Sequence, residues 1–225
     1  MALHEQTISH ILKQLADEYS SVVSERELCE RVLQQRPSQA KDPYASIRDK
    51  LRWDGSHVGW VRLGGGEVIP LRVVREGLSF RLIPNDDEYH HDGIPRYRLL
   101  PFLSSHDIAV QLVDADNRPI ATPPTPDLET EFVPANSLLS LGDWFRRSGF
   151  EQGDSILVTI VSHEPLRLRL EREPAAAFNA DDVLRQEREL VDAVAKLVAR
   201  SRSNLIPADE AILPLYARAE WRTTY

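Results

Sequence analysis

Cysteine is almost absent from this sequence of 225 residues, in which Cys29 is the only one. A single thiol excludes an intramolecular disulfide and a structural zinc site built on several thiolates. Cys29 lies on the apolar face of a predicted helix, where a buried, inert thiol is expected in preference to a nucleophile. The sequence therefore favours a packing role for this side chain.

Long apolar runs are also missing. The most apolar stretch, near Ile156–Val161, is far shorter than the roughly 20 residues that a membrane-spanning helix needs. The first residues, Met1 to Glu5, lack the charged and apolar regions of a secretory signal. Together these absences predict a cytoplasmic protein with no membrane partner.

An excess of positive charge is the third feature that the sequence lacks. The formal net charge is -8, which opposes loose binding to nucleic acid, because phosphate neutralisation supplies most non-specific affinity. Residues 1–84 hold twelve Lys/Arg and eleven Asp/Glu, so nearly all the acidic excess lies beyond residue 84. We therefore expect any DNA-binding surface in the first part of the chain.

Helix signals fill the first fifty residues. An apolar stripe at helical spacing runs through residues 5–19, and Ser24 with Glu27 forms a capping-box pattern before a second helix that stops ahead of Pro37. Asp42-Pro43 is a typical start for a third helix, residues 43–53. The inner face of this helix is predicted to carry Tyr44, Ile47 and Leu51.

Three short β-like runs follow at Val58–Leu63, Val68–Val74 and Leu78–Ile83, and a glycine turn, Gly64–Gly66, separates the first two. Three helices followed by a hairpin is the element order of a winged helix-turn-helix. We therefore expect an α+β protein with an N-terminal winged helix-turn-helix, a small β-barrel-like domain and a C-terminal helical tail.

Composition predicts the remaining boundaries. We expect a winged-helix-like domain over residues 1–84, a polar, acidic linker at 85–96, a β-rich barrel-like domain at 97–174 and a helical tail at 175–225. Predicted strands of the third part are Asp107–Val113, Leu128–Val133, Ser155–Val161 and Leu166–Leu170, and Leu138–Phe150 is predicted as a short helix ended by Gly149.

The helical tail carries a stripe of valine and leucine from Val183 to about Arg200. This stripe is short for a coiled coil, so packing on the preceding domain is the favoured interpretation. The alternating leucines of Leu166–Leu170 predict a strand with one dry and one wet face.

The third helix carries the candidate DNA-binding residues. Arginine and lysine pair with guanine edges or phosphates from a helix in the major groove, and serine and tyrosine suit backbone contacts. The alternative to DNA binding is that these residues form a solvated, charged helix face. Asp49 and Asp54 reduce the positive charge of the third helix. The candidates, which include one side chain near the hairpin tip, are Tyr44, Ser46, Arg48, Lys50, Arg52 and Arg62.

The stretch from Ser24-Glu25-Arg26-Glu27-Leu28 through Pro43–Arg48 to Trp60–Leu63 resembles the winged helix-turn-helix superfamily, and more loosely its HARE-type subset. The resemblance covers about a third of the chain. It implies a recognition surface on the third helix, formed by Ser46, Arg48, Lys50 and Arg52.

A second stretch, Leu141 to Ile160, has aromatic anchors, a Gly153-Asp154 turn and a following strand. It resembles the helix and Gly-Asp turn of AbrB-type and SymE-like barrels and of plant-type DNA-binding pseudobarrels. That resemblance implies nucleic-acid contacts by Arg146, Arg147, Arg167 and Arg169. The alternative, which the acidic composition favours, is that such turns build many small barrels with no common activity.

Patterns for catalysis are weak. Gly64–Gly66 is not followed by Gly-Lys-Ser/Thr, so it is no P-loop. His90-His91 lies in an acidic run that is better explained as solvated charge than as a metal site, and His106-Asp107 has no nucleophile to activate. Asp154, Glu171 and Glu173 resemble the carboxylates of metal-dependent nucleases, but Arg172 replaces the expected lysine. We predict no enzyme activity, cofactor or metal.

Two functions remain. The first is a DNA-binding regulatory protein that reads duplex DNA through the third helix. The second is a non-enzymatic protein-protein interaction or scaffold module of a larger assembly. The predicted partners are accordingly double-stranded DNA, or another protein or a second copy bound through residues 180–225.

Overall fold

The computed structural model describes residues 6–99, 102, 110–120, 138–200 and 208–219. The chain divides into two compact units, Met1–Val74 with Leu213–Arg218, and Arg75–Ile212 with Ala219–Tyr225. Both contain helices and sheets, so the predicted α+β class is confirmed. The predicted strand Leu128–Val133 and the pair His106-Asp107 lie outside the described residues.

Three helices form most of the first unit: α1 (Ile8–Glu18), α2 (Glu25–Gln35) and α3 (Ala45–Asp54). The Ser24 hydroxyl accepts the amide of Glu27 at 3.0 Å, which confirms the predicted start of α2. Helix α3 begins two residues later than predicted. The Asp42 carboxylate accepts the Tyr44 amide at 3.0 Å and closes the turn ahead of the helix.

The core of the first unit lies between these helices and β2 (Trp60–Gly64). Ile47 and Leu51 are buried and Tyr44 packs against the same cluster, as the helical spacing predicts. The indole Nε1 of Trp60 donates to the carbonyl of Leu12 at 2.8 Å, so the polar atom of this buried ring has a partner.

A three-stranded antiparallel sheet completes the first unit. Strands β1 (Val23–Ser24), β2 and β3 (Glu67–Pro70) pair in the order β1-β3-β2. The turn between β2 and β3 contains Gly64, Gly65 and Gly66, all with positive φ, which glycine adopts without a Cβ clash.

The predicted strand Val68–Val74 is wrong beyond Pro70, where helix α4 (Leu71–Arg75) begins. The chain leaves the sheet here because the guanidinium of Arg72 donates to three backbone carbonyls at the end of α1. The acceptors are Ala16, Asp17 and Tyr19, at 3.2, 3.2 and 2.6 Å. Arg72 thereby satisfies carbonyls that a helix end leaves without intrahelical partners.

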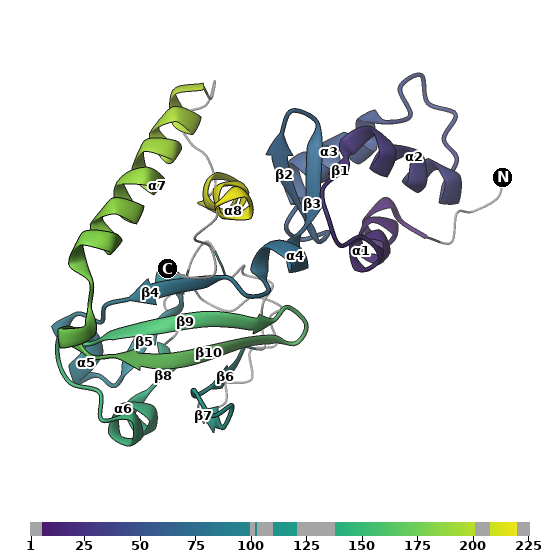
Figure 1. Ribbon diagram of the computed structural model, residues 1–225. Helices are drawn as coiled ribbons and strands as arrows, with labels where there is room; N and C mark the ends of the chain where they lie inside the picture. The colour runs from purple at the N-terminus through teal and green to yellow at the C-terminus, as the bar shows by residue number, and fades with distance from the viewer. Residues whose placement is uncertain (1–5, 100–101, 103–109, 121–137, 201–207, 220–225) are drawn as a thin grey trace. The chain divides into compact units, whose positions relative to one another are not determined.

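The second unit is built on a five-stranded sheet of order β4-β9-β10-β6-β7, in which the long strands β9 and β10 lie side by side (Figure 1). Only the β6–β10 pair is parallel. The strands are β4 (Ser79–Leu82), β6 (Val110–Val113), β7 (Pro119–Ile120), β9 (Ser155–Ser162) and β10 (Leu166–Glu173).

A separate ribbon, β5 (Gly93–Pro95) with β8 (Leu138–Ser140), accompanies this sheet. In the described part of the chain the edge strands β4 and β7 do not pair with each other, so no closed barrel forms. The predicted helix Leu138–Phe150 is shorter than expected. Its first residues form β8, and α6 (Gly142–Ser148) ends, as predicted, at Gly149, which has a φ of 65°.

Residues 85–96 are structured and do not form the expected acidic linker. They contain α5 (Asp86–His90) and β5, followed by the 3-10 turn η1 (Arg96–Leu99). Asn85 and Glu88 form a capping box, and the Glu88 carboxylate is buried against Arg98 at 3.1 Å. The acidic composition was misleading because Glu88 is buried and paired, while Tyr89 packs near Phe145.

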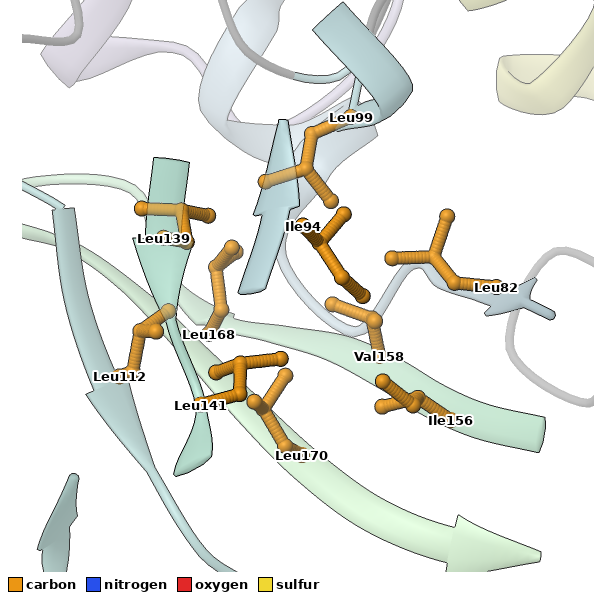
Figure 2. Close-up of a pocket in the computed structure, with 10 residues that line it drawn as sticks. All are labelled: Leu82, Ile94, Leu99, Leu112, Leu139, Leu141, Ile156, Val158, Leu168 and Leu170. Atoms are coloured by element: carbon orange, nitrogen blue, oxygen red, sulfur yellow. The ribbon is translucent and has the colours of Figure 1, made fainter. Parts of the chain in front are cut away.

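The apolar core of the second unit lies on the inner face of the sheet (Figure 2). The leucines of β10, Leu166, Leu168 and Leu170, are buried and Arg167 is exposed, which confirms the predicted dry and wet faces. A cavity of about 10 Å³ remains, little more than one water could occupy, and only apolar side chains line it. This interior is a packed core.

The last described elements are the turn η2 (Ala175–Ala177) and the helices α7 (Ala180–Arg200) and α8 (Ala208–Arg218). Val183 and Gln186, in the first turns of α7, are buried, whereas Leu184, Val191 and Val198 are exposed. The predicted packing of the whole stripe on the preceding domain is therefore incomplete. Among the described residues no helix is long and apolar enough to cross a membrane.

Candidate nucleic-acid interface

The outer face of α3 is the candidate binding surface, and α3 turns the predicted polar residues away from the core. Ser46, Arg48 and Arg52 are exposed, and Lys50 is half-buried. Arg48 and Arg52 are four residues apart and lie one above the other on the helix surface. This face is open to solvent because only Ile47 and Leu51, on the opposite side, take part in the core.

Three of the four candidate cations, Arg48, Lys50 and Arg62, have an acidic neighbour in the first unit. Arg48 pairs with Asp42 at 2.9 Å, Lys50 with Asp54 at 2.6 Å, and Arg62 of β2 with Glu25 at 3.3 Å. These cationic side chains are 35–48% exposed. The Arg48–Asp42 and Lys50–Asp54 pairs are open on both sides, and pairs of this kind are worth about 0–1 kcal/mol, so a phosphate group can replace either carboxylate at small cost.

The surface as a whole is close to neutral. Its four cations face three paired carboxylates and Asp49, which is exposed on α3 itself. A neutral face gives little long-range attraction for DNA. A cation of this surface can therefore contact a phosphate only when the two are close enough for the phosphate to replace a carboxylate.

Trp53 is the side chain on α3 that the sequence predictions missed. It is 70% exposed, and the guanidinium of Arg52 lies 5.0 Å from the centroid of its ring. The interaction of a cation with an aromatic face is worth about 0.5–1 kcal/mol at an exposed site. The signal was present in the sequence, since Trp53 falls outside the stripe of Tyr44, Ile47 and Leu51.

Tyr44 is held between the core and the exposed face. Its ring packs partly against the core of the first unit, and the Arg48 guanidinium lies 6.0 Å from the ring centroid. The Tyr44 ring and the Asp42 carboxylate therefore both lie beside the Arg48 guanidinium.

The second set of predicted arginines lies on two elements of the second unit, and each contacts an acid or an amide. On α6, Arg146 contacts Asp143 and Asp92, and Arg147 lies 3.7 Å from Asp114. On the wet face of β10, Arg167 donates to the Gln111 amide oxygen at 3.3 Å and Arg169 pairs with Glu171 at 2.8 Å. The four arginines therefore lie among acids and amides.

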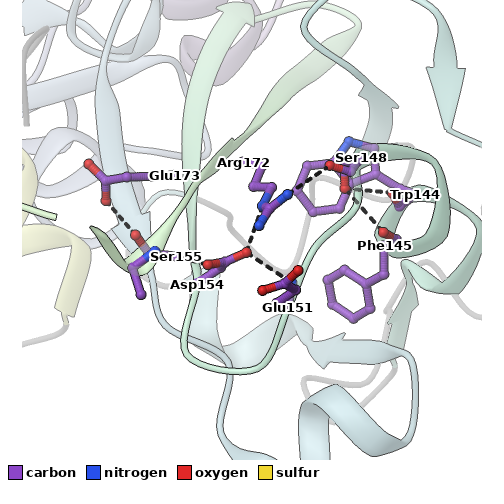
Figure 3. A network of polar contacts seen from close by, with 9 residues as sticks. Trp144, Phe145, Ser148, Glu151, Asp154, Ser155, Arg172 and Glu173 are labelled. Carbon is purple, nitrogen blue, oxygen red and sulfur yellow. Dashed lines mark hydrogen bonds and ion pairs between the residues drawn. The ribbon is translucent and has the colours of Figure 1, made fainter. Parts of the chain in front are cut away.

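The carboxylates that resembled a nuclease pattern have structural partners (Figure 3). Asp154 is 3% exposed and accepts hydrogen bonds from the amides of Glu151 and Ala175, both at 2.9 Å, and from Arg172 at 2.6 Å. Burial alone would raise the pKa of Asp154, but these hydrogen bonds hold the pKa below its ordinary value.

Glu173 has a comparable environment. Arg81 donates to both of its carboxylate oxygens, at 2.7 and 2.8 Å, and the Ser155 hydroxyl also donates to it. These hydrogen bonds lower the pKa of Glu173, with burial opposing the effect. Among the described residues no group of three or more His, Cys, Asp or Glu side chains is arranged to hold a metal ion.

Cys29 is buried, as its position on the apolar face of α2 predicts. Burial, with a smaller contribution from the nearby carboxylate of Glu25, raises the pKa of its thiol to about 11. At neutral pH this thiol is protonated, which makes it a poor nucleophile.

The candidate surface is thus a neutral face of paired charges, with an exposed tryptophan and a glycine turn in the same unit. No protein-family model, curated protein sequence or solved structure matches this chain.

Proposed function

We propose that this chain is a DNA-binding regulatory protein whose first unit is a winged-helix module that reads duplex DNA through α3. The observation that supports this most is topological. The element order α1-β1-α2-α3-β2-β3, with the sheet order β1-β3-β2, supports the winged helix-turn-helix that we propose. Under this proposal α3 serves as the recognition helix, and its outer face is open.

In the proposed complex α3 lies in the major groove. Arg48 and Arg52 face base edges or phosphates of the DNA, and the Ser46 hydroxyl donates to the DNA backbone. Arg62 and the glycine turn between β2 and β3 lie against an adjacent phosphate strand. For this to happen Arg48 must exchange Asp42 for a DNA acceptor, which the exposure of their ion pair permits.

The near-neutral surface sets the expected strength of binding. Four cations, Arg48, Lys50, Arg52 and Arg62, are assigned to DNA, and each phosphate neutralised contributes about -0.9 to the slope of log affinity against log salt. We therefore expect a slope between about -1 and -4, with the lower part of this range favoured because acids compete for the same cations.

A fluorescence titration of duplex DNA at several salt concentrations tests the proposal. A random duplex pool supplies the first probe, and a selected duplex supplies the second. The double variant Arg48→Glu/Arg52→Glu should lose binding at least tenfold. Arg31→Glu is the matched control, because Arg31 is also exposed and pairs at the surface, with Glu18 at 3.4 Å, but lies on α2. A slope of zero, or equal binding by the double variant, would rule out DNA reading by α3.

The exposure of Trp53 favours a second candidate, in which the first unit is an adaptor that binds another protein. Tryptophan and arginine are the residues most enriched at interface hot spots, and Trp53 with Arg52 provides both on one exposed patch. Proteins retained by the immobilised chain are compared with those retained by Trp53→Ala and by Arg31→Glu. Loss of a retained protein with Trp53→Ala alone supports the adaptor, and identical sets contradict it.

A further inference from the structure

Asp49 lies at the centre of the outer face of α3. It is two residues from Ile47 and two residues from Leu51, the buried residues of this helix. Because two residues are slightly more than half a helical turn, the Asp49 side chain points away from the core, and it is exposed. Arg52 and Trp53, which follow Asp49 by three and four residues, flank it on the same face.

Neither Asp49 nor Arg52 has an ion-pair partner in the described part of the chain. Residues three apart on a helix are close enough to pair, but the Arg52 guanidinium lies over the Trp53 ring, 5.0 Å from its centroid. The other charged side chains of α3 are all in ion pairs. The outer face of α3 therefore offers one hydrogen-bond acceptor and one forked donor that its own unit leaves available.

We propose that Asp49 accepts a hydrogen bond from the N4 amino group of a cytosine, while Arg52 donates to a guanine in the neighbouring base pair. This inference rests on the proposed function and names the base pairs that α3 reads. An ionised carboxylate can only accept hydrogen bonds. In the major groove cytosine presents a donor alone, guanine presents two acceptors, thymine presents an acceptor and a methyl group, and adenine presents an acceptor beside its donor. Cytosine is therefore the base that fits Asp49.

The charge of DNA makes this selection strict. A carboxylate that points into a groove lined by phosphates is repelled unless a base donates to it. Asp49 thus acts against duplexes that place guanine or thymine at the contacted position, and a repulsive group of this kind is a common source of specificity. Phosphate contacts alone do not supply such discrimination.

The spacing of the two side chains predicts a step of two base pairs. Three residues of helix rise by about 4.5 Å, which is close to the separation of about 3.4 Å between successive base pairs. With α3 along the groove, Asp49 and Arg52 therefore contact adjacent pairs. Arginine binds O6 and N7 of guanine with two hydrogen bonds, so the expected target contains two neighbouring C·G pairs.

Selection of duplexes from a random pool by the full chain tests this assignment. The wild type should enrich a site with a cytosine and a guanine in adjacent base pairs. Asp49→Asn should enrich adenine in place of that cytosine, because a side-chain amide accepts from N6 and donates to N7 of adenine. Arg52→Ala should keep the cytosine and lose the guanine. A gain of preference for adenine cannot result from unfolding of the variant.

Titration of the selected duplex measures the size of the effect. A second duplex carries T·A in place of the C·G pair assigned to Asp49. The wild type should bind this second duplex about tenfold more weakly, and Asp49→Ala should bind the two duplexes within about twofold of each other. Asp17→Ala is the matched control and should keep the wild-type preference. Asp17 is an exposed carboxylate of α1 that likewise has no ion pair among the described residues.

Two results would overturn the role of Asp49 while leaving DNA reading by α3 intact. The first is an Asp49→Ala variant that still discriminates tenfold against the T·A duplex. The second is a variant that loses only the preference for guanine, which would show that Asp49 acts through Arg52. A wild-type chain that enriches no duplex would overturn both this inference and the proposed function.

Discussion

The guanidinium of Arg48 donates to both carboxylate oxygens of Asp42, at 3.1 and 2.9 Å, while about half of each side chain remains exposed at 48% and 55%. This pair differs from that of Arg172 with Asp154, whose carboxylate is buried. The first can open to accept another partner, whereas opening the second would leave a buried charge without compensation. The distinction separates a candidate binding surface from a structural network.

Asp42→Asn is therefore predicted to strengthen DNA binding. The change removes the acid that competes for Arg48 and adds one unit of positive charge to the face. Affinity for a duplex should rise about three- to tenfold at low salt, with a slope steeper by up to about 0.9. The hydrogen bond that the Tyr44 amide donates in this turn is kept, because the side-chain oxygen of asparagine can accept it as the Asp42 carboxylate does.

Asp116→Asn is the control for that titration, since Asp116 also forms an exposed pair, with Arg118 at 3.3 Å, but belongs to the second unit. Equal affinity of Asp42→Asn and wild type would count against the exchange of partners by Arg48.

Trp60→Phe is predicted to destabilise the first unit by about 1–3 kcal/mol, because the buried carbonyl of Leu12 loses its indole donor and a small void remains. Urea unfolding followed by circular dichroism measures this change. Trp53→Phe is the matched control and should alter stability by less than about 0.5 kcal/mol, since Trp53 is exposed. Equal effects at the two positions would contradict the burial of Trp60.

Acid is predicted to weaken the second unit through Asp154 and Glu173. Both have a folded-state pKa below the ordinary values of 3.8 and 4.5. A lowered folded-state pKa means that the unfolded chain binds protons first, so the stabilisation is fully present above those ordinary values. It is then lost as the pH falls through the folded-state pKa values.

Unfolding free energies measured by urea between neutral pH and about pH 3 test this dependence. Asp154→Asn should be less stable than wild type at neutral pH, because Arg172 loses its ionic partner. The difference between the two proteins should shrink on acidification. An unchanged difference at low pH would show that the ionised carboxylate is not the stabilising form.

Cys29 is predicted to resist thiol reagents in the folded protein. Its thiol is buried and its pKa is raised to about 11, so at pH 8 both access and ionisation are limiting. A chromogenic disulfide reagent should react with less than one-tenth of the chains within minutes, and with all of them after unfolding in guanidinium. Rapid labelling without denaturant would show that α2 opens locally.

The local structure of this protein followed from local sequence rules. Ser24 caps α2 because its hydroxyl reaches an amide three residues away, and Ile47 with Leu51 faces inward because of helical spacing. The alternation of Leu166 to Leu170 likewise defines the two faces of β10, since successive strand residues point to opposite sides.

Contacts between residues that are far apart in the sequence determined the structure that local rules did not predict. The run at 85–96 is folded because its strand Gly93–Pro95 pairs with Leu138–Ser140, and Arg72 of α4 reaches the end of α1. The amino-acid composition of these segments predicts neither contact.

The candidate site follows the same division. Helical periodicity determined that Arg48 and Arg52 point outward, whereas the fold decided that Arg62 of β2 pairs with Glu25 of α2 and that Val191 of α7 remains uncovered. The physical reason is the separation along the chain over which each kind of interaction acts. Capping and alternation act over a few residues of the chain, whereas ion pairing and burial depend on which surfaces the whole chain brings together.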